Sequence, residues 1–287
     1  MNRTVIILTI MECHKQVKIE VLEKDETNLR VIIREAEVPL INALRRIALA
    51  EVPSMAIDEV VMIENSSILQ DEIIAHRLGL TPLKTDLDTY NLPEDCECHS
   101  EFGCALCRVT LTLEAEAKEG TRTVYSGEII SENPGIVPVS DKVPIIKLAK
   151  AQKLKLEAYA RLGKGKNHAK WQPVCMCVYK YYPKIEVPIK DCGDCEKCVA
   201  ICPKKVLAIK EDKVEVRDLL ACNLCMDCVD ACPKEPKDIK VDWEKNAFIL
   251  SIESSGALPP ERVLQQATKI LDKQLTEFQE QLKVEEQ

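Results

Sequence analysis

Apolar and polar residues alternate in the first part of the chain, between positions 16 and 38. A polar stretch at 23–28 interrupts the alternation and suits a turn. The pattern therefore predicts a β-hairpin with an apolar face on each strand. The apolar positions are Val17, Ile19, Val21, Leu29, Val31 and Ile33.

Two later segments have helical spacing. One lies between Val38 and Pro53, and the other begins at Pro259-Pro260, where a missing N–H costs little. The second carries a continuous apolar seam, formed by Leu264, Ala267, Leu271, Leu275, Phe278 and Leu282. Because one thin sheet cannot cover this much apolar surface, we expect part of it to be buried against another chain. The predicted interface residues are Leu40, Leu44, Ile47, Leu264, Leu271, Leu275 and Phe278.

The middle of the chain favours β-structure, so the expected fold class is α+β. Strand patterns cover 56–63, 107–117 and parts of 121–148, and one helix is expected at 68–80. A strand that ends at Tyr182 is expected to pair with the apolar segment 247–252. Residues 147–170 are locally basic, and a solvated face or an acidic protein partner explains them better than nucleic acid does.

Composition limits the possible functions. The 287 residues suffice for two or three domains, and a hydrophobic content of 46% excludes disorder throughout. A net charge of −8 argues against a surface that wraps nucleic acid. No phosphate-binding loop or catalytic constellation occurs, so we expect no catalytic residue in this chain. The apolar residues 5–11 are too few to span a bilayer and lack a cleavage site. We therefore expect a cytoplasmic protein without membrane contact, in which residues 1–10 form a ragged extension.

The cysteine content, 15 in all, is the most unusual feature of the composition. The run CxxCxxCxxxCP occurs twice, from Cys192 to Pro203 and from Cys222 to Pro233. In bacterial ferredoxins three thiolates of such a run hold one iron–sulfur cube and the fourth ligates the other. We therefore predict two [4Fe–4S] clusters with crossed ligands. The first ligand set is Cys192, Cys195, Cys198 and Cys232, and the second is Cys222, Cys225, Cys228 and Cys202.

A pair of zinc knuckles is the alternative, but zinc sites lack the third CxxC step and the ending before proline. Loss of one ligand would convert a cube into a [3Fe–4S] cluster. The clusters could serve as a redox or oxygen sensor, or they could hold a small fold element together. The structural role is the favoured interpretation, because metal binding contributes folding free energy. The alternative function for the whole chain is a ferredoxin-like electron-transfer subunit of an oxidoreductase.

A second group of cysteines precedes these runs. Four thiolates within a dozen residues can close a tetrahedron around one zinc ion, and His99 could replace one of them. Four free cysteines in a loop are the alternative. The group consists of Cys96, Cys98, Cys104 and Cys107. Of the remaining cysteines, Cys175 and Cys177 are expected to pack on a strand, and Cys13 has no assignment.

Four motifs of the chain resemble those of the alpha-like subunits of multisubunit RNA polymerases. Residues 41–53 (INALRRIALAEVP) resemble their first interface helix, and residues 71–83 (DEIIAHRLGLTPL) resemble a second signature. Residues 154–163 (LKLEAYARLG) with 168–174 (HAKWQPV) resemble a third, and residues 253–261 (ESSGALPPE) resemble the lead-in to a C-terminal dimerisation helix. The ferredoxin-like insertion is similar to that of the archaeal branch of this family, rather than to the bacterial alpha or the eukaryotic third subunit.

The resemblance implies a division into domains. It implies a split dimerisation domain at 11–55, 166–188 and 241–287, a mostly β insert domain at 56–165 and a ferredoxin-like iron–sulfur domain at 189–240. The segment 96–107 resembles the zinc loop of the eukaryotic relative, although its middle gap is longer.

The resemblance also implies a function, that of a non-catalytic assembly subunit of archaeal DNA-directed RNA polymerase. The implied partners are subunit L as a heterodimer, the small subunits N and P, and the second-largest catalytic subunit. Contact with DNA would be indirect.

Overall fold

The computed structural model describes residues 17–100, 102–187, 195–211, 213–234 and 237–284. The chain divides into two compact units, each assembled from segments far apart in the sequence. One unit holds the chain up to Leu22, together with Arg30–Ile41 and Val178–Leu250. The other holds Glu23–Leu29, Asn42–Cys177 and the chain from Ser251 onward. Both contain β-sheets with few helices, so the fold is a mixture of α and β structure.

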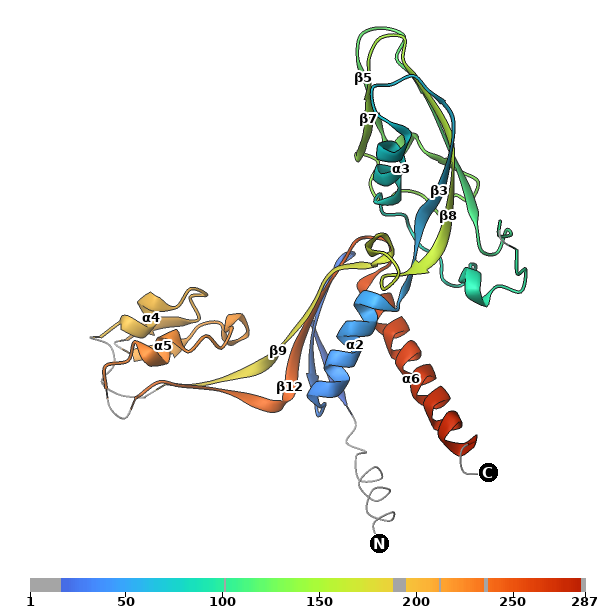
Figure 1. Cartoon of the computed structure of the whole chain (residues 1–287). Helices are drawn as coiled ribbons and strands as arrows, with labels where there is room; N and C mark the ends of the chain where they lie inside the picture. Colours follow the sequence, from blue (N-terminus) through green and yellow to red (C-terminus); the bar gives the residue numbers. More distant parts are fainter. Residues whose placement is uncertain (1–16, 101, 188–194, 212, 235–236, 285–287) are drawn as a thin grey trace. The chain divides into compact units, whose positions relative to one another are not determined.

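A four-stranded sheet with the order β3-β8-β4-β6 forms most of the second unit. Its long central strand, β8, pairs antiparallel with both β3 and β4. A separate two-stranded sheet, β5-β7, and the helix α3 lie near it (Figure 1). The elements are β3 (Pro53–Asn65), α3 (Asp71–Gly79), β4 (Val109–Glu116), β5 (Arg122–Tyr125), β6 (Ile130–Ser131), β7 (Pro144–Leu148) and β8 (Lys153–Lys164).

The core of this unit comes from the residues that face inward at every second position. Along β4, Val109, Leu111 and Leu113 are buried while the residues between them are more exposed, which is the alternation expected of a half-buried strand. From α3, Ile74 and Leu78 join the same core. The strands expected at 56–63 and 107–117 and the helix expected at 68–80 are thereby confirmed, with shifted boundaries.

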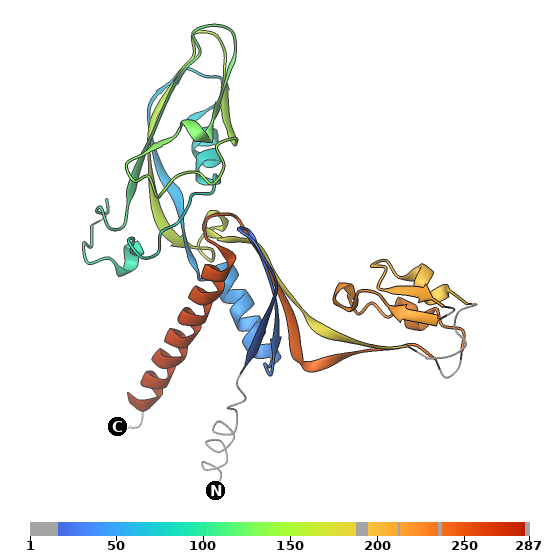
Figure 2. The same cartoon turned by 180° about the vertical axis from the view of Figure 1, so that it is seen from behind.

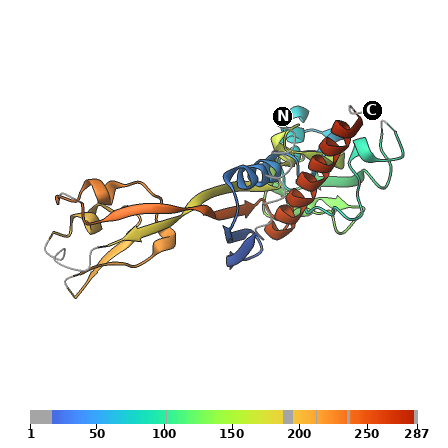
Figure 3. The same cartoon turned by 90° about the horizontal axis from the view of Figure 1, so that it is seen from below.

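A second four-stranded sheet has the order β1-β2-β12-β9. The hairpin predicted at its start is present, and the Asp25 carboxylate closes the turn by accepting hydrogen bonds from the Thr27 and Asn28 amides at 2.8 and 2.6 Å. The predicted pairing of the strand ending near Tyr182 with 247–252 is also confirmed, because β9 and β12 are neighbours that run side by side (Figure 3). The strands are β1 (Lys18–Lys24), β2 (Asn28–Arg34), β9 (Val174–Glu186) and β12 (Lys240–Ser254).

Two longer helices match the sequence predictions. Helix α2 (Val38–Ala50) ends before Pro53, and helix α6 (Pro260–Val284) begins at the second of two prolines. Proline suits this position because its fixed φ is helical and its missing N–H would have had no partner. Among the described residues, no helix is both long and apolar enough to cross a membrane.

The cysteine-rich segment is built from small elements. A hairpin joins β10 (Leu207–Lys210) to β11 (Lys213–Val216), with Leu207 opposite Val216. Two short helices, α4 (Lys197–Ile201) and α5 (Asp227–Asp230), lie beside this hairpin (Figure 2). The chain also contains short 3-10 helices: η1 (Pro93–Asp95), η2 (Ser126–Glu128), η3 (Ala169–Trp171) and η4 (Leu219–Ala221).

Candidate functional site

The four cysteines predicted to bind zinc lie together. Their sulfur atoms are all within 4.8 Å of one another, whereas His99 is outside the group. Three of the Sγ–Sγ distances are 3.7, 3.8 and 3.8 Å. In a tetrahedral zinc site with Zn–S bonds of about 2.3 Å, the sulfurs lie about 3.8 Å apart. The spacing therefore fits a tetrahedral metal ion, and the group could hold one. Its members are Cys96, Cys98, Cys104 and Cys107.

The loop around this group is shaped by backbone geometry. Gly103 has a φ of +76°, and a side chain there would press on Cys107 and Arg108. The Cys104 amide donates a hydrogen bond to the Cys107 sulfur at 3.2 Å. Such a bond stabilises a thiolate, which is the form that binds metal. The Arg108 guanidinium lies over the Tyr159 ring at 3.4 Å, which attaches the loop to β8.

The pKa values of two thiols in this group shift in opposite directions. A hydrogen bond from the Ser100 amide lowers the pKa of Cys98 to about 7. Burial raises the pKa of Cys107 to about 12. A buried thiol with so high a pKa remains protonated at neutral pH unless a cation is bound next to it. Metal binding would therefore release protons from the group.

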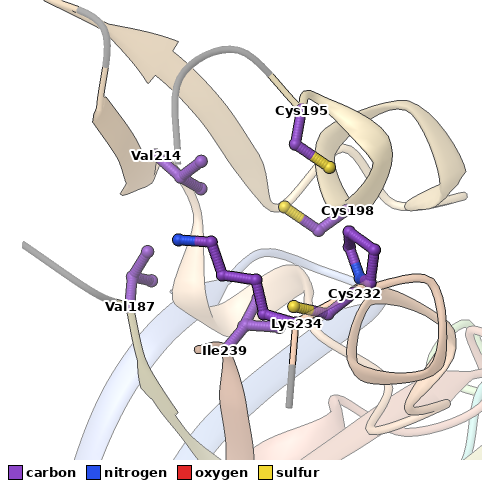
Figure 4. Close-up of a pocket in the computed structure, with 8 residues that line it drawn as sticks. Val187, Cys195, Cys198, Val214, Cys232, Lys234 and Ile239 are labelled. Carbon is purple, nitrogen blue, oxygen red and sulfur yellow. The ribbon is translucent and has the colours of Figure 1, made fainter. Parts of the chain in front are cut away.

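Three of the four ligands predicted for the first iron–sulfur cluster line one cavity. Cys195 and Cys198 lie close together, with the Cys232 sulfur facing them (Figure 4). The fourth predicted ligand, Cys192, lies outside the described residues. The other lining residues are Val187, Val214, Pro233, Lys234 and Ile239. Residues of both cysteine runs thus meet at this cavity, in the combination that the crossed pattern predicts.

All four ligands predicted for the second cluster line another cavity. Cys222, Cys225 and Cys228 come from the second run, and Cys202 comes from the end of the first. The Leu224 amide donates to the Cys222 sulfur, and the Val206 amide donates to the Cys202 sulfur, each at 3.4 Å. Amide hydrogen bonds to sulfur are a known influence on iron–sulfur centres. The rest of the lining is apolar except for Asn223, and includes Ile185, Val206, Leu207 and Val241.

The two runs repeat one local backbone geometry. In each, the residue after the second cysteine is left-handed, with φ of 48° at Glu196 and 68° at Met226. This residue precedes the short helix that carries the third cysteine. A left-handed non-glycine residue costs free energy, so its occurrence at both equivalent places indicates a functional constraint. The constraint that suits both runs is a loop wrapped around a bound group.

One thiol of the second cavity, that of Cys228, resists ionisation when no cation is present. Burial, followed by the neighbouring thiolates, raises the pKa of Cys228 to about 11. Four close thiolates repel one another, and positively charged iron would remove that repulsion. The donor set is therefore chemically suited to an iron–sulfur cluster.

Sequence reasoning missed two basic residues next to the second cavity. Lys180 on β9 donates hydrogen bonds to the carbonyls of Leu220 and Cys222, each at 2.6 Å. Arg30 on β2 donates to the same Leu220 carbonyl at 3.0 Å. Both belong to the same compact unit as the cavity. No local signal marks them, because they lie on strands distant in sequence from the cysteine runs.

The residues predicted to form a subunit interface differ in exposure. On α2, Leu44 and Ile47 are buried and Leu40 is half-buried. On α6, Leu264 and Leu271 are half-buried. The distal seam residues are much more exposed, at 54% for Leu275, 58% for Phe278 and 51% for Leu282. The uncovered apolar surface on these helices is thus concentrated in the second half of α6.

Most lysines of the basic stretch 147–170 are exposed, in line with the expected solvated face, and six of its basic side chains also form ion pairs within the chain. Asp58 pairs with both Arg161 and Lys170, and the second pair has an N–O distance of 2.5 Å. Further pairs join Lys153 to Glu116, Lys155 to Glu114, Lys164 to Glu94 and Lys166 to Glu51. The acids come from segments distant in sequence, so the local charge alone could not identify these pairs.

Other sequence predictions are settled by local contacts. The Asp86 carboxylate accepts hydrogen bonds from the Asp88 and Thr89 amides, which is the geometry of a turn. Cys177 is buried as predicted, but Cys175 is exposed, so the prediction that it packs was wrong. Burial along β9 does not alternate regularly there, since Cys175 and Met176 are both exposed.

Comparison with known proteins gives a consistent result. Residues 30–275 match the RNA polymerase Rpb3/Rpb11 dimerisation domain family. The chain is 40% identical to the DNA-directed RNA polymerase subunit Rpo3 of Methanosphaera stadtmanae over 88% of its length and 94% of the relative. It is 44% identical to the subunit of the same name from Archaeoglobus fulgidus, over 88% and 93% of the two chains. It is also 36% identical to the DNA-directed RNA polymerase II subunit rpb3 of Dictyostelium discoideum, over 96% and 97%. None of these names supports the alternative of an electron-transfer subunit.

Proposed function

Because the chain belongs to the RNA polymerase Rpb3/Rpb11 dimerisation domain family, we propose that it is the assembly subunit of an archaeal-type DNA-directed RNA polymerase. The observation that carries this proposal is the family match over 30–275, combined with the exposed seam at the end of α6. The subunit is non-catalytic and provides surfaces on which other subunits assemble. Subunit L is the proposed heterodimer partner, and subunits N and P and the second-largest catalytic subunit join afterwards.

The exposed half of α6 supports this role energetically. Leu275, Phe278 and Leu282 lie on one side of the helix, spaced three and four residues apart. Burying each of them would contribute about 1.5–3 kcal/mol. A partner helix that covers this seam therefore gains several kcal/mol, enough to favour a stable heterodimer. The seam continues the predicted interface residues Leu264 and Leu271.

The test is a single lysine placed on the seam. Phe278→Lys puts a charge in the proposed interface, and we expect it to abolish co-purification with subunit L. Thr276→Lys is the matched control, because at 100° per residue it faces away from the seam, and its side chain is also exposed. If Phe278→Lys retains subunit L as well as the control does, the proposed interface is wrong.

We further propose that the two cysteine runs bind two [4Fe–4S] clusters and that the 96–107 loop binds one zinc ion. The combination of cysteines at each cavity supports the crossed ligand sets given above. The sulfur spacing supports zinc in the loop. On this proposal, residues 189–240 form a ferredoxin-like domain inserted in a split dimerisation domain (11–55, 166–188 and 241–287), and 56–165 form the insert domain.

The clusters would serve mainly to hold this small domain together. Its described apolar core is formed by a few residues, among them Val206, Leu207, Val214 and Ile239. A core of this size rarely stabilises a fold alone, and metal binding adds folding free energy. When bound, a cluster also supplies one-electron redox chemistry. The test is iron, acid-labile sulfide and zinc analysis of the anaerobically purified full chain with its partner. Eight iron atoms and one zinc per chain are expected, and a chain that holds zinc without iron would contradict the cluster assignment.

A further inference from the structure

The second cysteine cavity is joined to the β1-β2-β12-β9 sheet by two positive charges. Arg30 lies on β2 and Lys180 on β9, the two strands on either side of β12. Both donate hydrogen bonds to the Leu220 carbonyl, and Lys180 also donates to the carbonyl of Cys222. Cys222 is itself one of the residues that line the cavity. Two strands of the sheet therefore hold the start of the second cysteine loop.

This arrangement places two like charges beside one another with only partial access to solvent. Arg30 and Lys180 are both half-buried. Burial lowers the pKa of Lys180, and the neighbouring Arg30 lowers it further. Cys222 and then Asp218 act on the pKa of Lys180 in the opposite sense, and the Asp218 carboxylate also accepts a hydrogen bond from the Ala221 amide. A negative group nearby would stabilise two cations held together in this way. An iron–sulfur cube with four thiolate ligands is such a group.

The first cavity is built differently. Its basic lining residue is Lys234, which forms an ion pair with Asp238 at 2.6 Å. That carboxylate offsets the positive charge of Lys234. At the second cavity, Arg30 and Lys180 bond to uncharged carbonyls, which leave their charges in place. Among the described residues, the two sites thus differ in what their basic side chains bond to, a carboxylate at the first cavity and backbone carbonyls at the second.

We propose that the positive charges of Arg30 and Lys180, beside the second cavity, raise the reduction potential of the cluster bound there above the potential of the cluster in the first cavity. The inference rests on the proposed binding of iron–sulfur clusters. Reduction adds one electron to an anionic cluster, and nearby positive charge stabilises the more negative product. Both residues are positioning residues, because they act on the cluster through the loop and through their charge. The second cluster is therefore the first to accept an electron.

The test compares reduction potentials in variants of the full chain co-produced with its partner subunit. Cys195→Ala/Cys198→Ala removes the first site, so that electron paramagnetic resonance during a redox titration reports the second cluster alone. In this background, Lys180→Met is expected to lower the equilibrium constant for reduction by about tenfold, or about 59 mV for one electron. Lys180→Arg keeps the charge and should restore the potential. Lys184→Met is the matched control, because Lys184 is an exposed lysine on the same strand, paired with Glu186.

The reciprocal background, Cys225→Ala/Cys228→Ala, reports the first cluster, whose potential should not change with Lys180→Met. Iron and sulfide content are measured in every sample. Should Lys180→Met lose its iron, Arg30→Met removes one charge while leaving both Lys180 bonds, and a smaller fall in potential is expected. An unchanged potential with full iron content would overturn the inference and leave the cluster proposal intact. A wild-type chain without iron at the second site would overturn both.

Discussion

Gly163 provides a sharp test of how the β3-β8-β4-β6 sheet is packed. It lies on β8, and a Cβ atom at this position would overlap the indole ring of Trp171. The buried indole cannot move aside freely. Its Nε1 donates to the Arg161 carbonyl at 3.2 Å, and the Trp171 carbonyl accepts from the buried Ser54 hydroxyl at 2.7 Å. Gly163→Ala therefore forces either the indole or the strand to shift.

The expected cost is the sum of two terms. Overpacking of a close-packed site costs about 1–3 kcal/mol. Loss of one hydrogen bond as the indole moves adds about 0.5–1.5 kcal/mol. We therefore expect Gly163→Ala to destabilise the chain by about 1.5–4.5 kcal/mol. The matched control is Gly79→Ala at the end of α3, where a Cβ would make only ordinary contacts, with the Ile57 carbonyl at 3.5 Å and the Lys170 Cδ at 4.0 Å. There alanine should be neutral or stabilising by up to about 1 kcal/mol.

The assay is urea unfolding followed by tryptophan fluorescence. The chain has two tryptophans, so a Trp243→Phe background leaves Trp171 as the reporter. With a slope of about 2 kcal/mol per molar urea, the midpoint for Gly163→Ala should fall by about 1–2 M. A midpoint equal to that of the parent, or a fall as large for Gly79→Ala, would refute the packing argument.

Two further changes test the charge network and the cysteine loop. Asp58→Asn leaves Arg161 and Lys170 without their shared carboxylate, and because Asp58 and Lys170 are largely buried, the free energy of unfolding in urea should fall by about 2–3 kcal/mol. Glu94→Gln breaks the pair with Lys164, in which Glu94 is exposed, and should lower the free energy of unfolding by no more than about 1 kcal/mol. If the two variants lost the same free energy of unfolding, burial would not explain the strength of the Asp58 pairs. Cys104→Ser should abolish zinc binding measured by elemental analysis, while Cys175→Ser, at an exposed cysteine outside the group, should retain it. Zinc retained in both variants would exclude Cys104 as a ligand.

Much of the fold follows from local patterns. The alternation of apolar and polar residues predicted the β1–β2 hairpin and strands of the β3-β8-β4-β6 sheet, because successive side chains on a strand point to opposite faces. The proline pair predicted the start of α6, since proline tolerates that position. Within each run, the two-residue gaps between cysteines predicted which thiols lie together, because a short loop brings its own sulfurs close to one another. These features depend on residues close in sequence.

Other properties depend on contacts between distant segments, and only the tertiary structure decided them. The basic stretch 147–170 looked unpaired in sequence, yet its charges meet acids such as Asp58 and Glu94. Arg30 and Lys180 carry no motif, and the sheet brings them to the second cysteine loop. The apolar stripe of α2 looked as exposed as that of α6, but Leu44 is buried and Phe278 is not. Periodicity shows that a helix has an apolar side, whereas the packing of remote segments determines whether that side is already covered.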